Sequence, residues 1–278
     1  MAEETVHRFA IGIDIGGTGI KAALVDTVTG QLAFKRLRVL TPKPSTPSAV
    51  AETIAELLEV LTARALELEL VTDRTDLDSL PVGCGFPGVI RDGLVESTAN
   101  LDQSWVGSAI AAVIGDRTGR RVHFLNDADA AGLAEMIFGA GRAHRKKTVL
   151  LTTLGTGIGT ALFTQARLVP YTELGHIEMN GADAETQAAE SVKVRLGLSY
   201  EEWAKRLQQY FSLIELLVAP DVIIVGGGVS KSHAEFLPLI STRAKLKPAK
   251  LFNNAGIVGA AMVAVNDGKT KVKKSDSH

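Results

Sequence analysis

The feature that most restricts the fold of this 278-residue chain is a nine-residue pattern that occurs twice. GTGIKAALV begins at Gly17 and GTGIGTALF begins at Gly155, and the two share G-T-G-I-x-x-A-L-x. In both places the glycines lie between short apolar segments that are typical of β-strands. Their starting points are about half a chain apart. A repeat at this spacing, in the same strand–loop–strand setting twice, predicts a duplicated domain with a cleft between two similar lobes.

The glycines in each copy predict a phosphate-binding loop of an uncommon kind. A dinucleotide fingerprint needs a helix after the glycines, but IKAALVD is short, contains β-branched Ile20 and Val25, and is followed by a turn and another strand. The Gly-Lys-Ser/Thr ending of a P-loop is absent. We therefore expect backbone N–H groups of a hairpin loop to hold the phosphate, with a tight hairpin that binds nothing as the alternative. The first glycine loop is Gly16, Gly17 and Thr18, and the second is Gly155, Thr156 and Gly157.

Two charged residues flank the first glycine loop. Asp14 precedes it, and a carboxylate there repels a phosphate unless a cation lies between them. Mg²⁺, held through water, is the expected cation. Lys21 follows the loop and is expected to balance phosphate charge. In the alternative, Asp14 only bonds nearby amides.

Hydrophobic periodicity predicts alternating strands and helices along the whole chain. Strands are expected at 9–15, 20–26, 31–40, 81–86, 121–125, 148–153, 160–164 and 221–225. Helices are expected at 47–67, 105–118, 128–138, 200–218, after Ser230 and at 255–265. We expect two domains, 1–125 and 126–278, with a last helix at about 255–266 that is able to pack on the first domain.

Composition excludes several classes of function. Thirty basic and 31 acidic residues give a net charge of −1, which does not favour a nucleic-acid or anionic-membrane partner. Cys84 is the only cysteine, so no internal disulfide or cysteine-based zinc site can form. No apolar run approaches the ~18 residues of a membrane span, and MAEETVHR is too acidic and polar for a secretory signal. We expect a cytoplasmic protein, monomeric or homodimeric.

Six motifs in order identify a family resemblance. They are DIGGTGIK, GFPGVI, NDADAAGLAE, TTLGTGIGTALF, ELGH and VGGGVS, and they extend from Asp14 to Ser230. With these motifs in this order, the chain resembles the ROK family of sugar kinases and, within that family, the polyphosphate glucokinases. The resemblance implies an actin-like ATPase (ribonuclease H-like) α/β fold. ROK members often have a cysteine-rich zinc loop after ELGH, but this chain has IEMNGADAE there, so we expect no zinc and His176 is expected to contact sugar only.

The resemblance also implies a site. Asp127 lies where a strand ends and a helix begins; its position is compatible with a helix N-cap, but the family's catalytic base falls there. The expected sugar ligands are Gly88, Asn100, Asn126, Asp127, Glu173, His176 and Glu185, the last less securely aligned. The third glycine loop, Gly226, Gly227 and Gly228, is expected against adenosine, and Ser230 is expected to cap the following helix.

The expected reaction is phosphorylation of the 6-hydroxyl of glucose, and of mannose, by inorganic polyphosphate or ATP with Mg²⁺. Charge does not establish polyphosphate use, because basic runs such as GRAHRKK, Lys193 and Arg195 are usually solvated surface. The alternatives are a strictly ATP-dependent ROK glucokinase and a non-enzymatic actin-like ATPase or sugar-sensing protein.

Overall fold

Each copy of the repeated pattern forms a β-hairpin in the computed structural model, which describes residues 8–272. In the first hairpin, β1 (Phe9–Ile15) pairs with β2 (Ile20–Asp26), and Ile15 lies opposite Ile20. In the second, β8 (Thr148–Leu154) pairs with β9 (Ile158–Thr164), and Leu154 lies opposite Ile158. The hairpin interpretation of both glycine loops is therefore confirmed.

The two hairpins belong to two sheets with the same topology. One has the order β3-β2-β1-β4-β7 and the other β10-β9-β8-β13-β14. In each, three antiparallel strands are followed by two strands parallel to the hairpin's first strand. This equivalence confirms the duplicated α/β fold. The remaining strands are β3 (Leu37–Val39), β4 (Val82–Phe86), β7 (Val122–Asn126), β10 (Arg167–Val169), β13 (Val222–Gly226) and β14 (Lys245–Pro248).

The chain divides into two compact units, one around each sheet. The first unit contains the described residues up to Ala130 and those from Gly256 onward, and the second is Ala131–Ala255. The predicted boundary after residue 125 lies five residues earlier, and the prediction assigns the last helix to the second domain while allowing it to pack on the first. The N-terminal residues 1–7, on which the localisation argument partly depends, and residues 273–278 lie outside the described residues.

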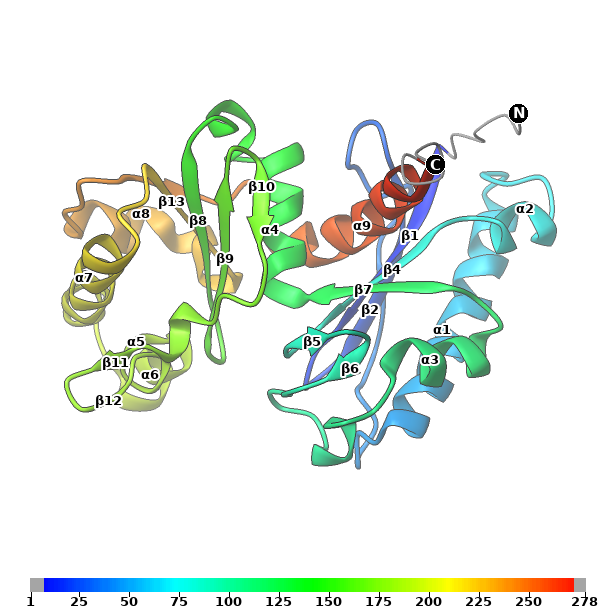
Figure 1. The fold of residues 1–278 in the computed structure, drawn as a ribbon, viewed down its shortest axis with the longest axis horizontal. Coiled ribbons are helices and arrows are strands. Elements are labelled where there is room, and N and C mark those ends of the chain that lie inside the picture. Colours follow the sequence, from blue (N-terminus) through cyan, green and yellow to red (C-terminus); the bar gives the residue numbers. More distant parts are fainter. Residues whose placement is uncertain (1–7, 273–278) are drawn as a thin grey trace, which may run out of the picture. The chain divides into compact units, whose positions relative to one another are not determined.

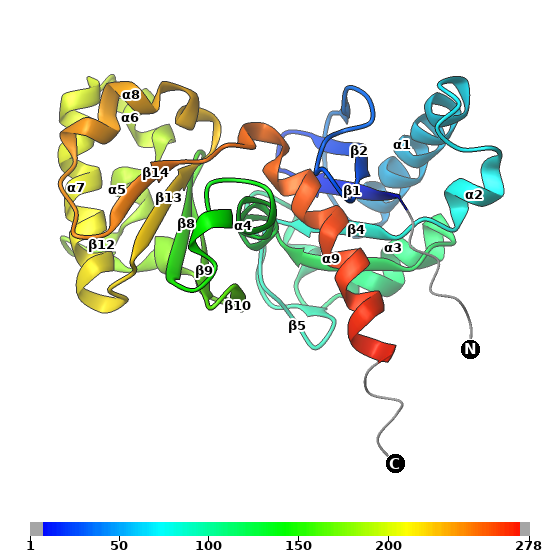
Figure 2. The same ribbon diagram turned by 90° about the horizontal axis from the view of Figure 1, so that it is seen from above.

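In the first unit, helices cover both faces of the sheet (Figures 1 and 2). Ile11, Ile13 and Ile15 alternate along β1 and join the apolar core with α1 (Pro47–Glu67) and α3 (Ile110–Thr118). On the opposite face, Gly12 and Gly83 are paired neighbours on β1 and β4. A Cβ at either glycine would collide with the backbone of α9 (Ala255–Val272). The missing side chains therefore allow α9 to lie directly on the sheet.

The second unit repeats this arrangement (Figure 1). One face of its sheet forms an apolar core with α7 (Tyr200–Leu217), in which Trp203, Tyr210 and Phe211 are fully buried. The other face receives α4 (Asp127–Ile137), where Gly132 lies against Ala161 and Phe163 of β9. Shorter helices complete this unit: α5 (Glu185–Ala188), α6 (Glu190–Leu196) and α8 (His233–Phe236).

Three expected elements are wrong in extent. The strand expected at 31–40 is only β3: Leu32 forms an isolated antiparallel bridge with Val25 of β2, but residues 33–36 are not part of a strand. The helix expected at 105–118 is a 3₁₀ turn, Gln103–Trp105, and a separate α3; Gly107 between them has φ 82°, which no helix accommodates. After Ser230 the chain forms only short helical turns. Minor elements are α2 (Arg74–Asp78), β5 (Ile90–Arg91), β6 (Leu94–Val95), β11 (Glu178–Met179) and β12 (Ala182–Asp183).

None of the helices among residues 8–272 combines the length and apolar character that a membrane span requires.

Candidate functional site

The first glycine loop is oriented by donors on the segment after β3. Thr41 Oγ1 donates to Gly16 O at 2.5 Å, and Lys43 Nζ donates to Gly17 O at 3.2 Å. In a trans peptide the C=O of one residue and the N–H of the next point in opposite directions. The N–H groups of Gly17 and Thr18 therefore point away from these donors. Backbone N–H groups of a glycine loop, turned away from such donors, are of the kind that bind anions.

Asp14 and Lys21 form an ion pair beneath this loop. They lie opposite each other across the hairpin, and Lys21 Nζ is 2.6 Å from Asp14 Oδ2. Gly256, in the first turn of α9, lies against the same carboxylate, and a helix N-terminus favours negative charge. The described residues contain no cluster of three or more His, Cys, Asp or Glu side chains able to hold a metal. One carboxylate beside a phosphate loop fits the way Mg²⁺ is usually held, through water and the phosphates themselves.

Asn126 and Asp127 mark the junction of β7 and α4. Asn126 Oδ1 accepts the N–H groups of Ala128 at 2.8 Å and Asp129 at 3.2 Å. Asn126 is therefore the residue that caps α4, the role that the sequence left open for Asp127. Asp127 occupies the first helical position, where its carboxylate accepts from Ala128 N at 2.7 Å. The positive end of the helix stabilises a charged carboxylate here.

Gly88 and Asn100 connect the Asn126–Asp127 junction with the first glycine loop, within the first unit. Asn126 Nδ2 donates to Gly88 O at 3.2 Å. A Cβ on Gly88 would collide with Ser97 O, so glycine permits the close approach of the segment that leads to Asn100. Asn100 Cβ in turn lies 2.6 Å from where a Cβ on Gly17 would be. The structure thus brings the predicted residues of the first unit into one connected group.

The second glycine loop is held in the same way as the first. Ser191, at the start of α6, donates its N–H to Gly155 O at 3.0 Å and its hydroxyl to Thr156 O at 2.6 Å. By the same peptide geometry, the N–H groups of Thr156 and Gly157 point away from Ser191. Ser191 was not predicted, and no local pattern singles it out, because it contacts the loop only after the chain has folded.

The third glycine loop lies beside the second. Gly227 has φ 88°, and a Cβ there would collide with Leu154 O at the end of β8. The expectation that Ser230 caps a helix is wrong: its hydroxyl donates to Gly227 O at 2.7 Å inside a 3₁₀ turn. Ser230 is fully buried and stabilises the loop from within.

Glu173, His176 and Glu185 form a second group of predicted residues, in the second unit. His176 Nδ1 is 2.9 Å from Asp183 Oδ2 and 4.0 Å from Glu185 Oε1. Burial by itself lowers the pKa of His176, but the bond to Asp183 and the charges of Glu185 and Glu173 outweigh it, so the pKa is raised. Burial also raises the pKa of Glu173, and His176 partly opposes this. Half-exposed acids and an imidazole together offer the donors and acceptors that a polyol requires.

Glu185 also connects this group to the second glycine loop. Its Oε2 accepts from Ile158 N at 3.1 Å, directly after Gly157. Asp183 was not predicted, although it stands two residues before Glu185 and shares the small two-stranded β11–β12 sheet with the segment after His176. The predicted residues therefore form one group in each unit.

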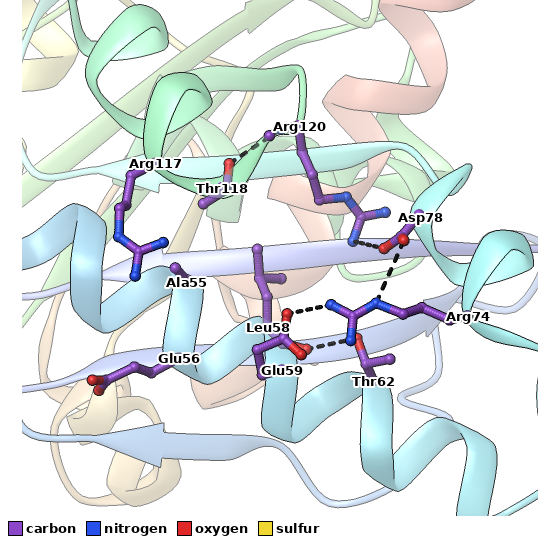
Figure 3. Close-up of a pocket in the computed structure, with 11 residues that line it drawn as sticks. Ala55, Glu56, Leu58, Glu59, Thr62, Arg74, Asp78, Arg117, Thr118 and Arg120 are labelled. Carbon is purple, nitrogen blue, oxygen red and sulfur yellow. Dashed lines mark hydrogen bonds and ion pairs between the residues drawn. The ribbon is translucent and has the colours of Figure 1, made fainter.

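A surface groove of about 470 Å³ in the first unit is lined by none of the predicted site residues (Figure 3). It lies between α1, α2 and the end of α3. Its arginines are engaged locally: Arg74 pairs with Glu59, Arg117 pairs with Glu52, and Arg120 donates to Leu77 O at 2.5 Å. The two ion pairs link α1 with α2 and with α3 across the groove.

Comparison with known proteins gives a consistent result. A model of the ROK family matches residues 10–190. Polyphosphate glucokinase of Mycobacterium tuberculosis is 44% identical over 95% of this chain and 94% of that protein, and the Mycobacterium leprae protein of that name is 43% identical over 94% and 76%. The crystal structure of inorganic polyphosphate/ATP-glucomannokinase from Arthrobacter is similar, with a TM-score of 0.86, 48% identity, and coverage of 94% of this chain and all of that one. A Streptomyces griseus ROK glucokinase in complex with glucose and AMPPNP has a TM-score of 0.75 and 25% identity, over 93% and 99%.

Proposed function

The chain belongs to the ROK family, and from this premise we propose that it is a sugar kinase that phosphorylates the 6-hydroxyl of glucose with inorganic polyphosphate or ATP. The single observation that supports this most strongly is the 44% identity, over 95% of the chain, to relatives named polyphosphate glucokinases. The similar Arthrobacter structure is named for both donors and for glucose and mannose together, which supports mannose as a second acceptor.

Asp127 is the proposed general base. The attacking sugar hydroxyl loses a proton as its oxygen bonds to phosphorus, and a positioned carboxylate accepts that proton. Asn126 holds the first turn of α4, so the backbone that carries Asp127 is fixed before substrate binds. Asn100 and Gly88, which belong to the same connected group, complete the proposed sugar contacts of the first unit.

Glu173, His176 and Glu185 are the proposed sugar ligands of the second unit. Asp183 orients His176 through Nδ1, which leaves Nε2 to meet a hydroxyl. Carboxylates accept hydrogen bonds from neighbouring hydroxyls, so the group discriminates a polyol from water by the number of simultaneous bonds.

The two amide-lined glycine loops are the proposed phosphate contacts, one in each unit, and the third glycine loop lies beside the second. Asp14 is the proposed residue that holds Mg²⁺ through water, with Lys21 released from its ion pair to meet donor phosphate. When bound, Mg²⁺ supplies neutralisation of the charge that develops on the transferred phosphoryl group.

A matrix of phosphorylation assays tests this proposal. Glucose, mannose and glucosamine are each paired with ATP and with polyphosphate, and sugar 6-phosphate is measured. We expect turnover of glucose with at least polyphosphate. If glucose is phosphorylated with ATP but not with polyphosphate, the protein is a strictly ATP-dependent glucokinase. The likeness to the AMPPNP-bound Streptomyces enzyme favours this second candidate. Absence of phosphorylation in every combination contradicts the kinase proposal.

A further inference from the structure

Four lysines lie on or near β14, the edge strand of the second unit's sheet. Lys245 and Lys247 lie on β14, Lys250 lies two residues beyond its end, and Lys147 directly precedes β8. We call these four residues the lysine row. β14 is bonded to β13 on one side and is the final strand in the sheet order, so its lysines lie at an edge. An edge strand with lysines is also a common protection against aggregation, which is the structural alternative.

The lysines of β14 share one face of the sheet. Side chains alternate along a strand, so Lys245 and Lys247 point to the same side and Leu246 to the other. Leu246 packs against the apolar core that contains α7. Lys245 and Lys247 therefore lie on the opposite face, the face that α4 covers.

His144, which follows α4 in the chain, is close enough to the lysine row to be affected by its positive charge. Burial and the positive charges of Lys247, Lys245 and Lys147 lower its pKa, while Asp221 acts in the opposite direction. Lys147 Nζ is 3.7 Å from Asp221 Oδ1, so one acid partly balances the row at this end. The strand register agrees, because Val222 of β13 pairs with both Lys245 and Val149, so Lys147 lies at the same end of the sheet as Lys245.

The lysine row leads from one end of the sheet to the other. Lys245 N donates to Asp221 O, just before β13 begins. At the far end, Ala249 N donates to Val225 O, which places Lys250 beside the third glycine loop. Five residues of extended chain span about 17 Å. Buried Glu135 holds Lys250 at that end by accepting its backbone N–H at 2.8 Å.

An extended row of separated positive charges suits a linear polyanion better than a compact ligand. Lysines are mobile point charges, which contact repeated phosphates without demanding one geometry. A nucleoside triphosphate is too short to occupy a glycine loop and the distant end of the row together. We propose that the lysine row binds the distal part of a long inorganic polyphosphate chain whose terminal phosphate is the donor. This inference depends on the proposed function, since it extends the donor site of that reaction.

The test compares donors of different length in one variant. In Lys245→Gln/Lys247→Gln we expect KM for polyphosphate of dozens of units to rise about tenfold, from two lost surface ion contacts. KM for tetrapolyphosphate and for ATP should stay within about twofold, because neither is long enough to reach Lys245 and Lys247 from the glycine loops. Added salt should raise KM for the long chain less steeply in the variant than in the wild type. The matched control is Lys35→Gln/Lys205→Gln, which removes two exposed lysines elsewhere and should change nothing.

Comparing donors within the same variant separates binding from misfolding, which would affect all donors alike. An unchanged KM for the long chain, or an equal rise for all donors, overturns the inference. If the wild type does not use polyphosphate as a donor, the proposed function fails in that part, and calorimetry with long polyphosphate still tests the row: equal affinity for wild type and variant overturns it. The inference is also overturned if the variant loses affinity for a single-stranded oligonucleotide but keeps its affinity for polyphosphate, because the row is then a nucleic-acid surface.

Discussion

Replacing Asp127 by asparagine should separate catalysis from folding. Asn126 caps α4 by accepting two N–H groups, whereas the Asp127 carboxylate accepts from Ala128 N at 2.7 Å. An asparagine side chain retains an oxygen for that bond but has little basicity. We therefore expect Asp127→Asn to lower kcat about 10²- to 10⁴-fold, the usual contribution of a general base. The free energy of unfolding should fall by less than about 1 kcal/mol, because the substitution removes a charge that the helix N-terminus stabilises.

The neighbouring substitution Asn126→Ala provides the matched comparison. It removes the helix cap, which costs about 1–2 kcal/mol. It also removes the hydrogen bond to Gly88 O, which contributes about 1 kcal/mol. The sum, about 2–3 kcal/mol, should appear in urea unfolding of Asn126→Ala and be absent from Asp127→Asn.

Three measurements decide this prediction: initial rates with saturating glucose, calorimetric binding of glucose, and urea unfolding of each variant. For Asp127→Asn we expect glucose binding within a few-fold of wild type. If that variant retains activity within about tenfold of wild type, the proton acceptor is another group or none. If it instead unfolds as easily as Asn126→Ala, the assignment of the cap to Asn126 is refuted.

Two further predictions test the packing and the electrostatics. Gly83→Ala should lower the free energy of unfolding by about 1–3 kcal/mol, because the new Cβ collides with the Ala260 carbonyl of α9. The control is Gly115→Ala, whose Cβ has more room and which should change the free energy of unfolding by less than about 1 kcal/mol. Equal effects of the two substitutions in urea unfolding contradict the close approach of α9. Asp183→Asn should lower the pKa of His176, as measured by NMR titration, because the hydrogen-bonded carboxylate raises that pKa. Because the pKa of His176 is raised in the folded state, the associated stability is present below about pH 6.5, the pKa in the unfolded state. It is lost as the pH rises through the folded-state pKa. The difference in the free energy of unfolding between wild type and variant should therefore be larger at pH 6 than at pH 9. An unchanged His176 titration rules out Asp183 as the cause.

Local sequence patterns were sufficient for the hairpins, because their signals are local. Ile20 and Val25 after the first glycine loop favour a strand over a helix, and the repeat at Gly155 implies the same hairpin again. The expected helix from residue 105 to 118 was wrong for an equally local reason. Gly107 adopts a positive φ, but glycine in a sequence permits such a conformation without requiring it.

The candidate site shows where local reasoning ends. Asn126 and Asp127 are adjacent and both able to cap a helix, and only the folded junction assigned the cap to Asn126. Ser191 holds the second glycine loop from 35 residues away, and Asp183 reaches His176 across a small sheet. Partners of this kind are selected by three-dimensional packing, which one sequence does not display.

Strand periodicity and glycine position are local properties, so they predict a duplicated α/β protein with two glycine-containing hairpins. The packing of α9 on the first sheet, against Gly12 and Gly83, follows only from the fold. The same is true of the lysines of β14 and Lys147, which lies almost a hundred residues earlier but at the same end of the sheet. The physical reason is the same in both cases: burial of a helix and accumulation of charge depend on distances between segments, and those distances exist only once the chain has folded.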